Sequence, residues 1–137
     1  MMLVRTYLSS SLIEGVGVFA AEPIKQGDMI WQLDPKFDVL FKESDVAGWP
    51  PHMDDFIRRY CYRHRDLDGT WVLELDNGRF INHSYSPNTS FEEFYSGHAL
   101  TDIKAGEELT CNYFDFDVEF NGTFFEATQA AKDELRT

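Results

Sequence analysis

These 137 residues are enough for one hydrophobic core and too few for several independent domains. Lys and Arg number 12 against 24 Asp and Glu, which gives a formal net charge of −12. That charge has the wrong sign for holding a phosphate backbone, so we expect no direct nucleic-acid binding. Because 43% of the residues are hydrophobic and 15% aromatic, the chain is not an acidic disordered tail. We expect a folded acidic domain with a basic partner.

The two cysteines, Cys61 and Cys111, lie far apart in the sequence and belong to no CxxC motif. No clustered histidines complete a four-ligand set, so we expect no metal site. No apolar run approaches the roughly 18 residues that cross a bilayer, and the first residues lack the pattern of a secretory signal. We therefore expect a soluble intracellular chain, cytoplasmic or nuclear, with reduced thiols and no membrane association.

The predicted elements are mostly short strands rich in apolar, aromatic and β-branched residues. In chain order these strands cover residues 3–7, 18–20, 29–33, 39–41, 71–75, 89–94, 99–100 and 108–111. One helix is predicted over residues 53–60, because its apolar side chains recur at helical spacing. A second helix is predicted from Thr123, where Thr-Phe-Phe-Glu has the form of a capping box. The fold class is mainly β with short helices, in a single domain over residues 1–137.

A short internal repeat adds to this picture. The pattern A-x-x-x-I-K-x-G-D over residues 20–28 recurs as A-x-x-x-I-K-x-G-E over residues 99–107. In each copy the glycine can take positive φ in a turn between two strands. Two copies do not make a stacked solenoid. The repeat predicts two similar strand–turn–strand units related by pseudo-symmetry inside one β domain.

Two segments are candidates for a site, although each has a simple structural interpretation. Residues 79–88 read Arg-Phe-Ile-Asn-His-Ser-Tyr-Ser-Pro-Asn, which suits either a turn with side-chain-to-backbone bonds or a functional loop. The adjacent His83 and Ser84 are weak evidence for hydrolysis, because the Gly-x-Ser-x-Gly elbow is missing. Residues 15–17, Gly-Val-Gly, form either a plain turn or a place where backbone approaches a ligand, and they lack the third glycine of a dinucleotide fingerprint.

A third segment, Gly-Glu-Glu-Leu-Thr-Cys-Asn-Tyr over residues 106–113, follows these two. The three motifs in this order resemble the SET-domain protein lysine methyltransferases, and the resemblance spans about residues 12–114. It implies a β-clip-like fold of small curled sheets in which the Asn-His-Ser segment and the Tyr-ended strand cross in a C-terminal pseudoknot. Residues 115–137 would then supply a lid and a terminal helix. No cysteine-rich segment follows Tyr113, so the zinc-bound lid of some members is absent.

The resemblance also implies the chemistry: S-adenosylmethionine bound on one face, and a lysine side chain entering a narrow channel from the other. Tyr113 matches the family's catalytic tyrosine, and Tyr60 is a second candidate for the active centre. The cofactor-binding candidates are Gly15, Val16, Gly17, Asn82 and His83, with Phe114 and Phe116 as an aromatic lid. Cys111, Tyr60 and Tyr113 would line the substrate channel, where the small Cys111 leaves room for more than one methyl group. No metal is implied.

Each of the two tyrosines also has a structural interpretation, Tyr60 as a core aromatic on the predicted helix and Tyr113 as a strand-end residue with a satisfied hydroxyl. The acidic residues around Tyr113 would attract a basic protein or Lys-rich peptide, although a solvated acidic face explains them equally. They are Glu107, Glu108, Asp115, Asp117, Glu119 and Glu126. The leading hypothesis is a lysine methyltransferase. It would be a homodimer if a second subunit is needed to complete the site. The alternatives are a catalytically inactive SET-like module that binds a basic protein, and an enzyme that methylates small amines.

Overall fold

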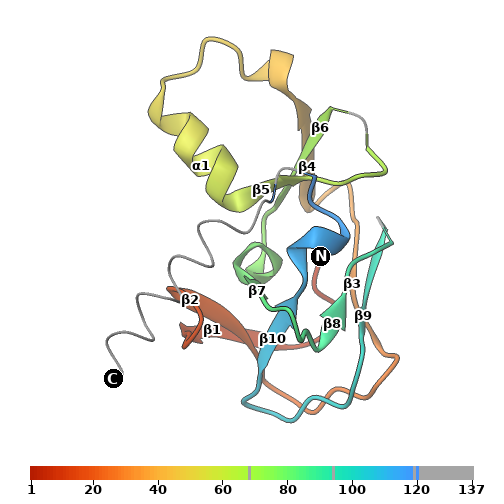
Figure 1. Ribbon diagram of the computed structural model, residues 1–137. Helices are drawn as coiled ribbons and strands as arrows, with labels where there is room; N and C mark the ends of the chain where they lie inside the picture. Colours follow the sequence, from red (N-terminus) through yellow and green to blue (C-terminus); the bar gives the residue numbers. More distant parts are fainter. Residues whose placement is uncertain (68, 94, 119, 121–137) are drawn as a thin grey trace.

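The computed structural model describes residues 1–67, 69–93, 95–118 and 120, and Figure 1 shows their arrangement. Short strands dominate it, with one α-helix and three 3-10 helices among the described residues. The strands are β1 (Thr6–Ser10), β2 (Val16–Ala20), β3 (Met29–Gln32), β4 (Asp38–Lys42), β5 (Cys61–Arg63), β6 (Thr70–Glu74), β7 (Asn82–His83), β8 (Thr89–Ser90), β9 (Ser96–Ala99) and β10 (Glu108–Cys111). The helices are η1 (Glu43–Asp45), α1 (His52–Tyr60), η2 (Asn77–Phe80) and η3 (Tyr113–Asp115).

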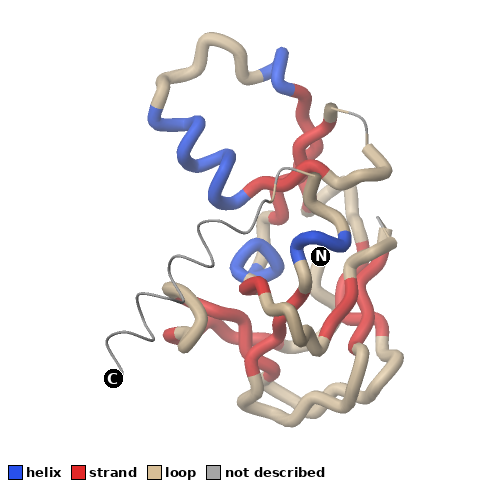
Figure 2. The backbone as a smooth tube through the Cα atoms, in the orientation of Figure 1, coloured by secondary structure: helices blue, strands red, loops and turns tan. Residues whose placement is uncertain are grey.

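The strands form three small sheets with the orders β1-β2-β10-β7, β3-β9-β8 and β4-β6-β5. Figure 2 shows the third sheet with α1 beside it at the top of the view, and the other two below. The described strand pairs are antiparallel except for β7 with β10, which run parallel. A mainly β fold of small sheets, expected from the sequence, is thereby confirmed.

The internal repeat pairs with itself. Ile24 and Ile103 exchange both of their backbone hydrogen bonds at 2.8 Å, as an isolated antiparallel bridge. The N–H of Gly27 donates to the carbonyl of Ala99 at 2.9 Å, and the equivalent bond of the other copy runs from Gly106 to Ala20 at 2.7 Å. Both glycines have positive φ, 87° and 88°. The predicted pseudo-symmetry is therefore an antiparallel crossing of the two copies.

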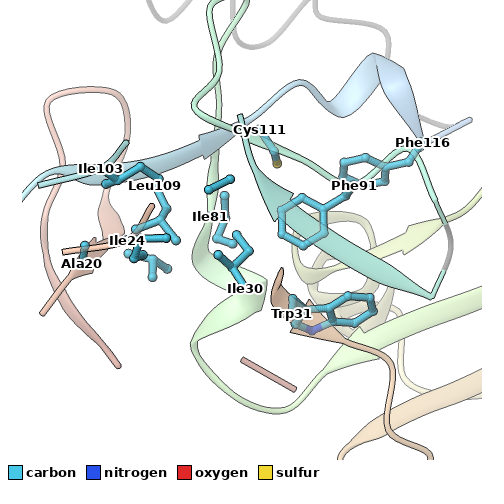
Figure 3. Packing of buried hydrophobic residues seen from close by; sticks show 12 residues of the cluster. Ala20, Ile24, Ile30, Trp31, Ile81, Phe91, Ile103, Leu109, Cys111 and Phe116 are labelled. Carbon is cyan, nitrogen blue, oxygen red and sulfur yellow. The ribbon is translucent and has the colours of Figure 1, made fainter. Parts of the chain in front are cut away.

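The main core lies where the first two sheets meet. Figure 3 shows Ile24, Ile103 and Leu109 on one side of this cluster and Trp31 with Phe91 on the other. The Trp31 and Phe91 rings meet edge to face at 5.8 Å. A smaller cluster contains Ile57, Cys61 and Trp71 and packs α1 against the third sheet. Because α1 buries only one narrow stripe, it covers that sheet without entering the main core.

Several predicted boundaries are wrong. The strand predicted over residues 3–7 lies at Thr6–Ser10, because Leu3 pairs instead with Ile30 of β3, its N–H donating at 2.7 Å. Of the strand predicted over 89–94, the described residues 89–93 form only the two-residue strand β8. The short strands β5 and β7 were not predicted, since two or three residues carry no period. The helix predicted from Thr123 lies outside the described residues.

The segment after β7 wraps around β10. Asn82 and His83 pair in parallel with Thr110 and Cys111, and the N–H of Ser84 donates to the Cys111 carbonyl at 2.9 Å. Further along, Asn88 receives the N–H of Thr110 on its Oδ1 at 2.8 Å and donates from Nδ2 to the Glu108 carbonyl, also at 2.8 Å. Strand β10 is thus held by backbone on one side and by an amide side chain further along. This arrangement brings two sequence motifs about thirty positions apart onto one site.

Candidate functional site

His83 and Tyr113 are joined where β7 and β10 end. The backbone N–H of Tyr113 donates to Nδ1 of His83 at 3.0 Å, so Nδ1 is an acceptor and the neutral imidazole carries its proton on Nε2. Burial lowers the pKa of His83, and only the Asp115 charge acts against this. His83 is therefore neutral near pH 7. Its role in this geometry is to hold the chain at Tyr113.

The Tyr113 side chain reaches back along the same segment. Its hydroxyl donates to the backbone carbonyl of Ile81, which fixes the direction of the ring. Burial, with smaller contributions from nearby acidic groups, raises the pKa of Tyr113 well above its usual value. The side chain stays a neutral phenol at physiological pH, so it can orient a group by hydrogen bonding but does not act as a phenolate base.

Asn82, one residue before His83, is turned toward the glycine turn at the start of β2. Its Nδ2 donates to the carbonyls of Glu14 and Val16 at 3.1 and 3.2 Å and to Oε1 of Glu108 at 2.9 Å. Gly15, between the two residues whose carbonyls accept from Asn82, has a φ of 48°. Left-handed backbone of this kind favours glycine, which explains the first position of the Gly-Val-Gly motif.

A cavity of about 650 Å³ lies beside these residues, within the range of roughly 300–1,000 Å³ typical of small-molecule sites. Its walls come from the turn before β2, the end of α1, β5, β6, η2, β7, the end of β10 and the residues after it. The lining residues are Ile13, Glu14, Gly15, Val16, Trp31, Asp55, Arg58, Arg59, Tyr60, Cys61, Tyr62, His64, Glu74, Gly78, Arg79, Phe80, Ile81, Asn82, His83, Phe91, Glu93, Cys111, Tyr113, Phe116, Asp117 and Phe120.

One wall of the cavity is cationic and aromatic. The guanidinium of Arg79 lies over the ring of Phe80 at 4.8 Å and near that of Tyr60 at 5.9 Å. Arg59 forms an ion pair with Glu14 at 3.3 Å, so its charge is partly neutralised across the cavity mouth. The Tyr60 and Phe80 rings meet edge to face at 5.8 Å. Tyr60 therefore belongs to the aromatic wall of the cavity. It is also the last residue of α1, as the helix predicted over residues 53–60 implies.

Another wall holds groups that keep their protons. Glu74 is buried, and burial, then the neighbouring Asp38 and Asp76 charges, raise its pKa to about 8. The Tyr62 hydroxyl donates to Glu74 Oε1 at 3.4 Å. Burial raises the pKa of Cys61 to about 11 and that of Cys111 well above its usual value, so both free cysteines are neutral thiols. A cationic ligand group entering here would meet no ionised thiolate.

Most of the site residues expected from the sequence meet at this cavity. They are Gly15, Val16, Tyr60, Asn82, His83, Cys111, Tyr113 and Phe116. Gly17 and Phe114 are not among its lining residues. Phe114 is about half exposed and packs against Tyr85 and His83, whereas Phe116 is buried in the core against Tyr62 with ring centroids 5.1 Å apart.

Some residues around the site were missed from the sequence. Glu74 lies on a predicted strand whose apolar pattern gives no sign of a buried carboxylate, yet Val72 and Glu74 are buried while Leu75 is exposed. Arg79 has no signal of its own in the sequence, although it precedes the aromatic residue of its motif. No periodic signal distinguishes such residues, because their burial depends on which element packs over them.

Within the described residues, no group of three or more His, Cys, Asp or Glu side chains is arranged to hold a metal ion. None of the described helices has both the length and the apolar character needed to cross a bilayer.

Small curled sheets, a strand wrapped by an Asn-His segment and a cavity at their crossing define a SET-type domain. The chain belongs to the SET-domain family, whose model, described as "SET domain", matches residues 15–114. Histone-lysine N-methyltransferase EZH2 of Chaetomium thermophilum is 30% identical over 115 residues, which cover 74% of this chain and 7% of that protein. The chain thus spans a small part of this curated relative.

Solved structures show the same fold. A humanized mutant of the Chaetomium thermophilum Polycomb Repressive Complex 2, bound to the inhibitor GSK126, matches with a TM-score of 0.62 and 25% identity over 85% of this chain and 16% of that chain. The ctPRC2 complex in an autoinhibited conformation, bound to S-adenosylmethionine, matches with a TM-score of 0.60 over 96% of this chain and 17% of that chain. At 21% identity, the second match shows the fold alone.

Proposed function

We propose that this chain is an S-adenosylmethionine-dependent protein-lysine N-methyltransferase that acts on a lysine of a basic protein or peptide. The observation that carries the proposal is the meeting of Gly15, Asn82, His83 and Tyr113 at one cavity. Three separate motifs supply these residues, and hydrogen bonds between them hold the arrangement. A relative named as a histone-lysine N-methyltransferase supports the reaction type.

The residues present fit such a cofactor. The left-handed turn at Gly15 exposes backbone at the cavity without a Cβ in the way, and Asn82 supplies an amide whose nitrogen is already engaged by protein acceptors. The aromatic wall around Tyr60 and Phe80 offers flat apolar surface to an adenine ring. When bound, this cofactor supplies a methyl group on a positively charged sulfur.

The lysine amine must lose its proton before it can attack. Its solution pKa is about 10.4, and a desolvated channel beside a positive sulfonium disfavours the charged ammonium. With the cofactor bound, the neutral nitrogen would accept the methyl group, and the electron pair of the carbon–sulfur bond would remain on sulfur. Positioning at about 3–3.5 Å supplies much of the rate enhancement.

Tyr113 would orient the amine. Its neutral hydroxyl donates to the Ile81 carbonyl, which leaves the oxygen lone pairs as acceptors for an amine N–H. Such a contact directs the nitrogen lone pair along the reaction axis without transferring a proton to the phenol. Cys111 is a small neutral thiol that precedes Tyr113 by two residues. It would leave more space around the amine than an aromatic side chain would.

The substrate class follows from charge. Glu93 and Asp117 line the cavity, and Glu107 lies exposed on the turn before β10. With a net charge of −12, the chain would steer Lys-rich segments toward itself in a salt-dependent way. We therefore favour a basic protein or peptide over a small amine.

The test is transfer of a radiolabelled methyl group from S-adenosylmethionine to a panel of basic proteins and Lys-rich peptides, with Lys→Arg peptides as matched controls. We expect label on lysine peptides alone. Label on small amines at comparable kcat/KM would contradict a protein substrate and support an enzyme that methylates small amines. Salt-sensitive binding of basic proteins without any measurable cofactor binding would contradict the proposed enzyme activity. It would support an inactive module that binds a basic protein.

A further inference from the structure

The carboxylate of Glu108 is turned inward, although its sequence context suggested an acidic surface. Glu108 is half-buried at the start of β10. Its Oε1 accepts from Asn82 Nδ2 at 2.9 Å and from the Ser11 hydroxyl at 2.8 Å, and its Oε2 lies 3.0 Å from the same hydroxyl. This charge is therefore engaged inside the protein rather than presented to a substrate.

Gly17 provides the room for this carboxylate. A Cβ at position 17 would lie 2.0 Å from Oε1 of Glu108 and 3.2 Å from Cβ of Ser11, both well inside contact distance. Gly17 does not line the cavity, so its requirement for glycine has a different cause from that of Gly15. The second glycine of the Gly-Val-Gly motif serves the Glu108 carboxylate and, through it, Asn82.

The hydrogen bonds of Asn82 fix which way its amide faces. All three acceptors around Nδ2 are oxygens, two of them backbone carbonyls and the third the Glu108 carboxylate. An amide turned by 180° would place its own oxygen against these three oxygens, which is repulsive. Asn82 Oδ1 is consequently directed away from these three oxygens. Asn82 is itself one of the residues that line the cavity.

We propose that Glu108 is a positioning residue, which locks the Asn82 amide so that Oδ1 accepts a hydrogen bond from the ammonium group of the cofactor's amino-acid part. This inference rests on the proposed function. The carboxylate acts in two ways, by fixing the orientation and by polarising the amide, since donation from Nδ2 to an anion increases the negative charge on Oδ1. Glu108 itself touches neither cofactor nor substrate.

Isothermal titration of S-adenosylhomocysteine, which keeps the ammonium group, into the full chain tests the proposal. We expect Glu108→Ala to weaken binding about 10-fold or more, since a hydrogen bond to a charged group is lost. Glu108→Gln keeps an oxygen acceptor for Nδ2 and should retain most of the affinity. Glu107→Ala removes a neighbouring exposed carboxylate and should change binding less than 2-fold.

A second probe separates positioning from general damage to the fold. 5′-Methylthioadenosine has the adenosine part without the ammonium, so Glu108→Ala should bind it as the unsubstituted chain does. Equal losses for both probes, or unchanged S-adenosylhomocysteine binding by Glu108→Ala, would overturn the proposal.

Ligand-free NMR makes the inference independent of the proposed function. The side-chain amide protons of Asn82 should exchange slowly with solvent in the unsubstituted chain and fast in Glu108→Ala. If the unsubstituted chain binds no S-adenosylhomocysteine, the proposed function fails. If Asn82 shows no protection in the ligand-free chain, the amide lock fails by itself.

Discussion

Nδ1 of His83 accepts the backbone N–H of Tyr113 at 3.0 Å, and this bond joins the end of β7 to the residues that follow β10. The imidazole is packed on several sides by aromatic rings, among them Phe120 at 4.7 Å and Tyr113 at 5.3 Å. The histidine of the Asn-His-Ser motif therefore determines where the tyrosine of the third motif lies.

Tyr113→Phe should lower methyl transfer roughly 100-fold or more, because the oxygen that orients the amine is lost. S-Adenosylhomocysteine binding should change little, since the hydroxyl is bonded to a backbone carbonyl. Rates with saturating peptide and calorimetric titration measure the two effects. Tyr7→Phe is the matched control, because Tyr7 lies on β1 and stacks on Phe19. An undiminished rate in Tyr113→Phe would contradict the role of the hydroxyl.

His83→Ala should lower the free energy of unfolding by about 2–4 kcal/mol, since it opens a cavity and leaves the Tyr113 N–H without its acceptor. His83→Asn places an oxygen near the position of Nδ1 and should cost clearly less. Urea denaturation of both variants measures the difference. Equal losses in the two variants would show that packing alone, and not the hydrogen bond, holds this residue.

The His83 imidazole should also make stability depend on pH. Burial lowers its pKa, so below about 6.5 the unfolded chain takes up a proton that the folded chain does not. The stabilisation is present above pH 6.5 and is lost as the pH falls toward the lower pKa of the folded state. The stability advantage of the unsubstituted chain over His83→Asn should therefore shrink between pH 7 and pH 5. An advantage that grows on acidification would contradict the prediction.

Glu74 should have the opposite pH dependence. Its pKa of about 8 in the folded state lies above the ordinary 4.5, so the folded chain holds a proton that the unfolded chain has lost. This contribution is complete below pH 4.5 and disappears as the pH rises through 8, with a loss of about 2 kcal/mol between pH 6 and pH 8. Glu74→Gln keeps an acceptor for Tyr62 and should not show that loss. Urea titrations at both pH values test this, and parallel declines in the two proteins would contradict it.

Gly27→Ala and Gly106→Ala should cost about the same, roughly 1 kcal/mol each, because both glycines have φ near 88°. A Cβ at Gly27 meets nothing within 4 Å, and one at Gly106 only the Tyr7 hydroxyl at 4.0 Å, so backbone strain alone acts. Gly97→Ala is the contrasting variant, since its Cβ would lie 2.4 Å from the Phe91 ring, and it should cost about 2–3 kcal/mol. Thermal unfolding separates the two causes.

Much of the site could be read from the sequence because its residues come in compact motifs. Gly15, Gly27 and Gly106 could be recognised because each has a positive φ. A left-handed backbone favours glycine whatever the tertiary surroundings of the turn. The helix over residues 53–60 was equally readable, since its apolar stripe has a regular period, and α1 begins one residue earlier.

Other features depended on contacts between distant segments. The two-residue strand β7 exists only because β10 runs beside it, and Thr6–Ser10 forms β1 because Leu3 has already paired with β3. The resemblance assigns Gly17 to cofactor binding, and the structure adds that a carboxylate from β10 lies beside it. Such relationships have no local signature in the chain.

The sequence by itself determined the motifs, the mainly β class and the excess of acidic charge, because turns, strand periods and composition are local or additive properties. Only the tertiary structure decided how each charge is used. Among the acidic residues near Tyr113, the turn before β10 leaves Glu107 in solvent and brings the next residue, Glu108, onto Ser11 and Asn82. The physical reason is that burial and hydrogen-bond partners arise from the crossing of segments, and identical carboxylates one position apart then differ in environment and in role.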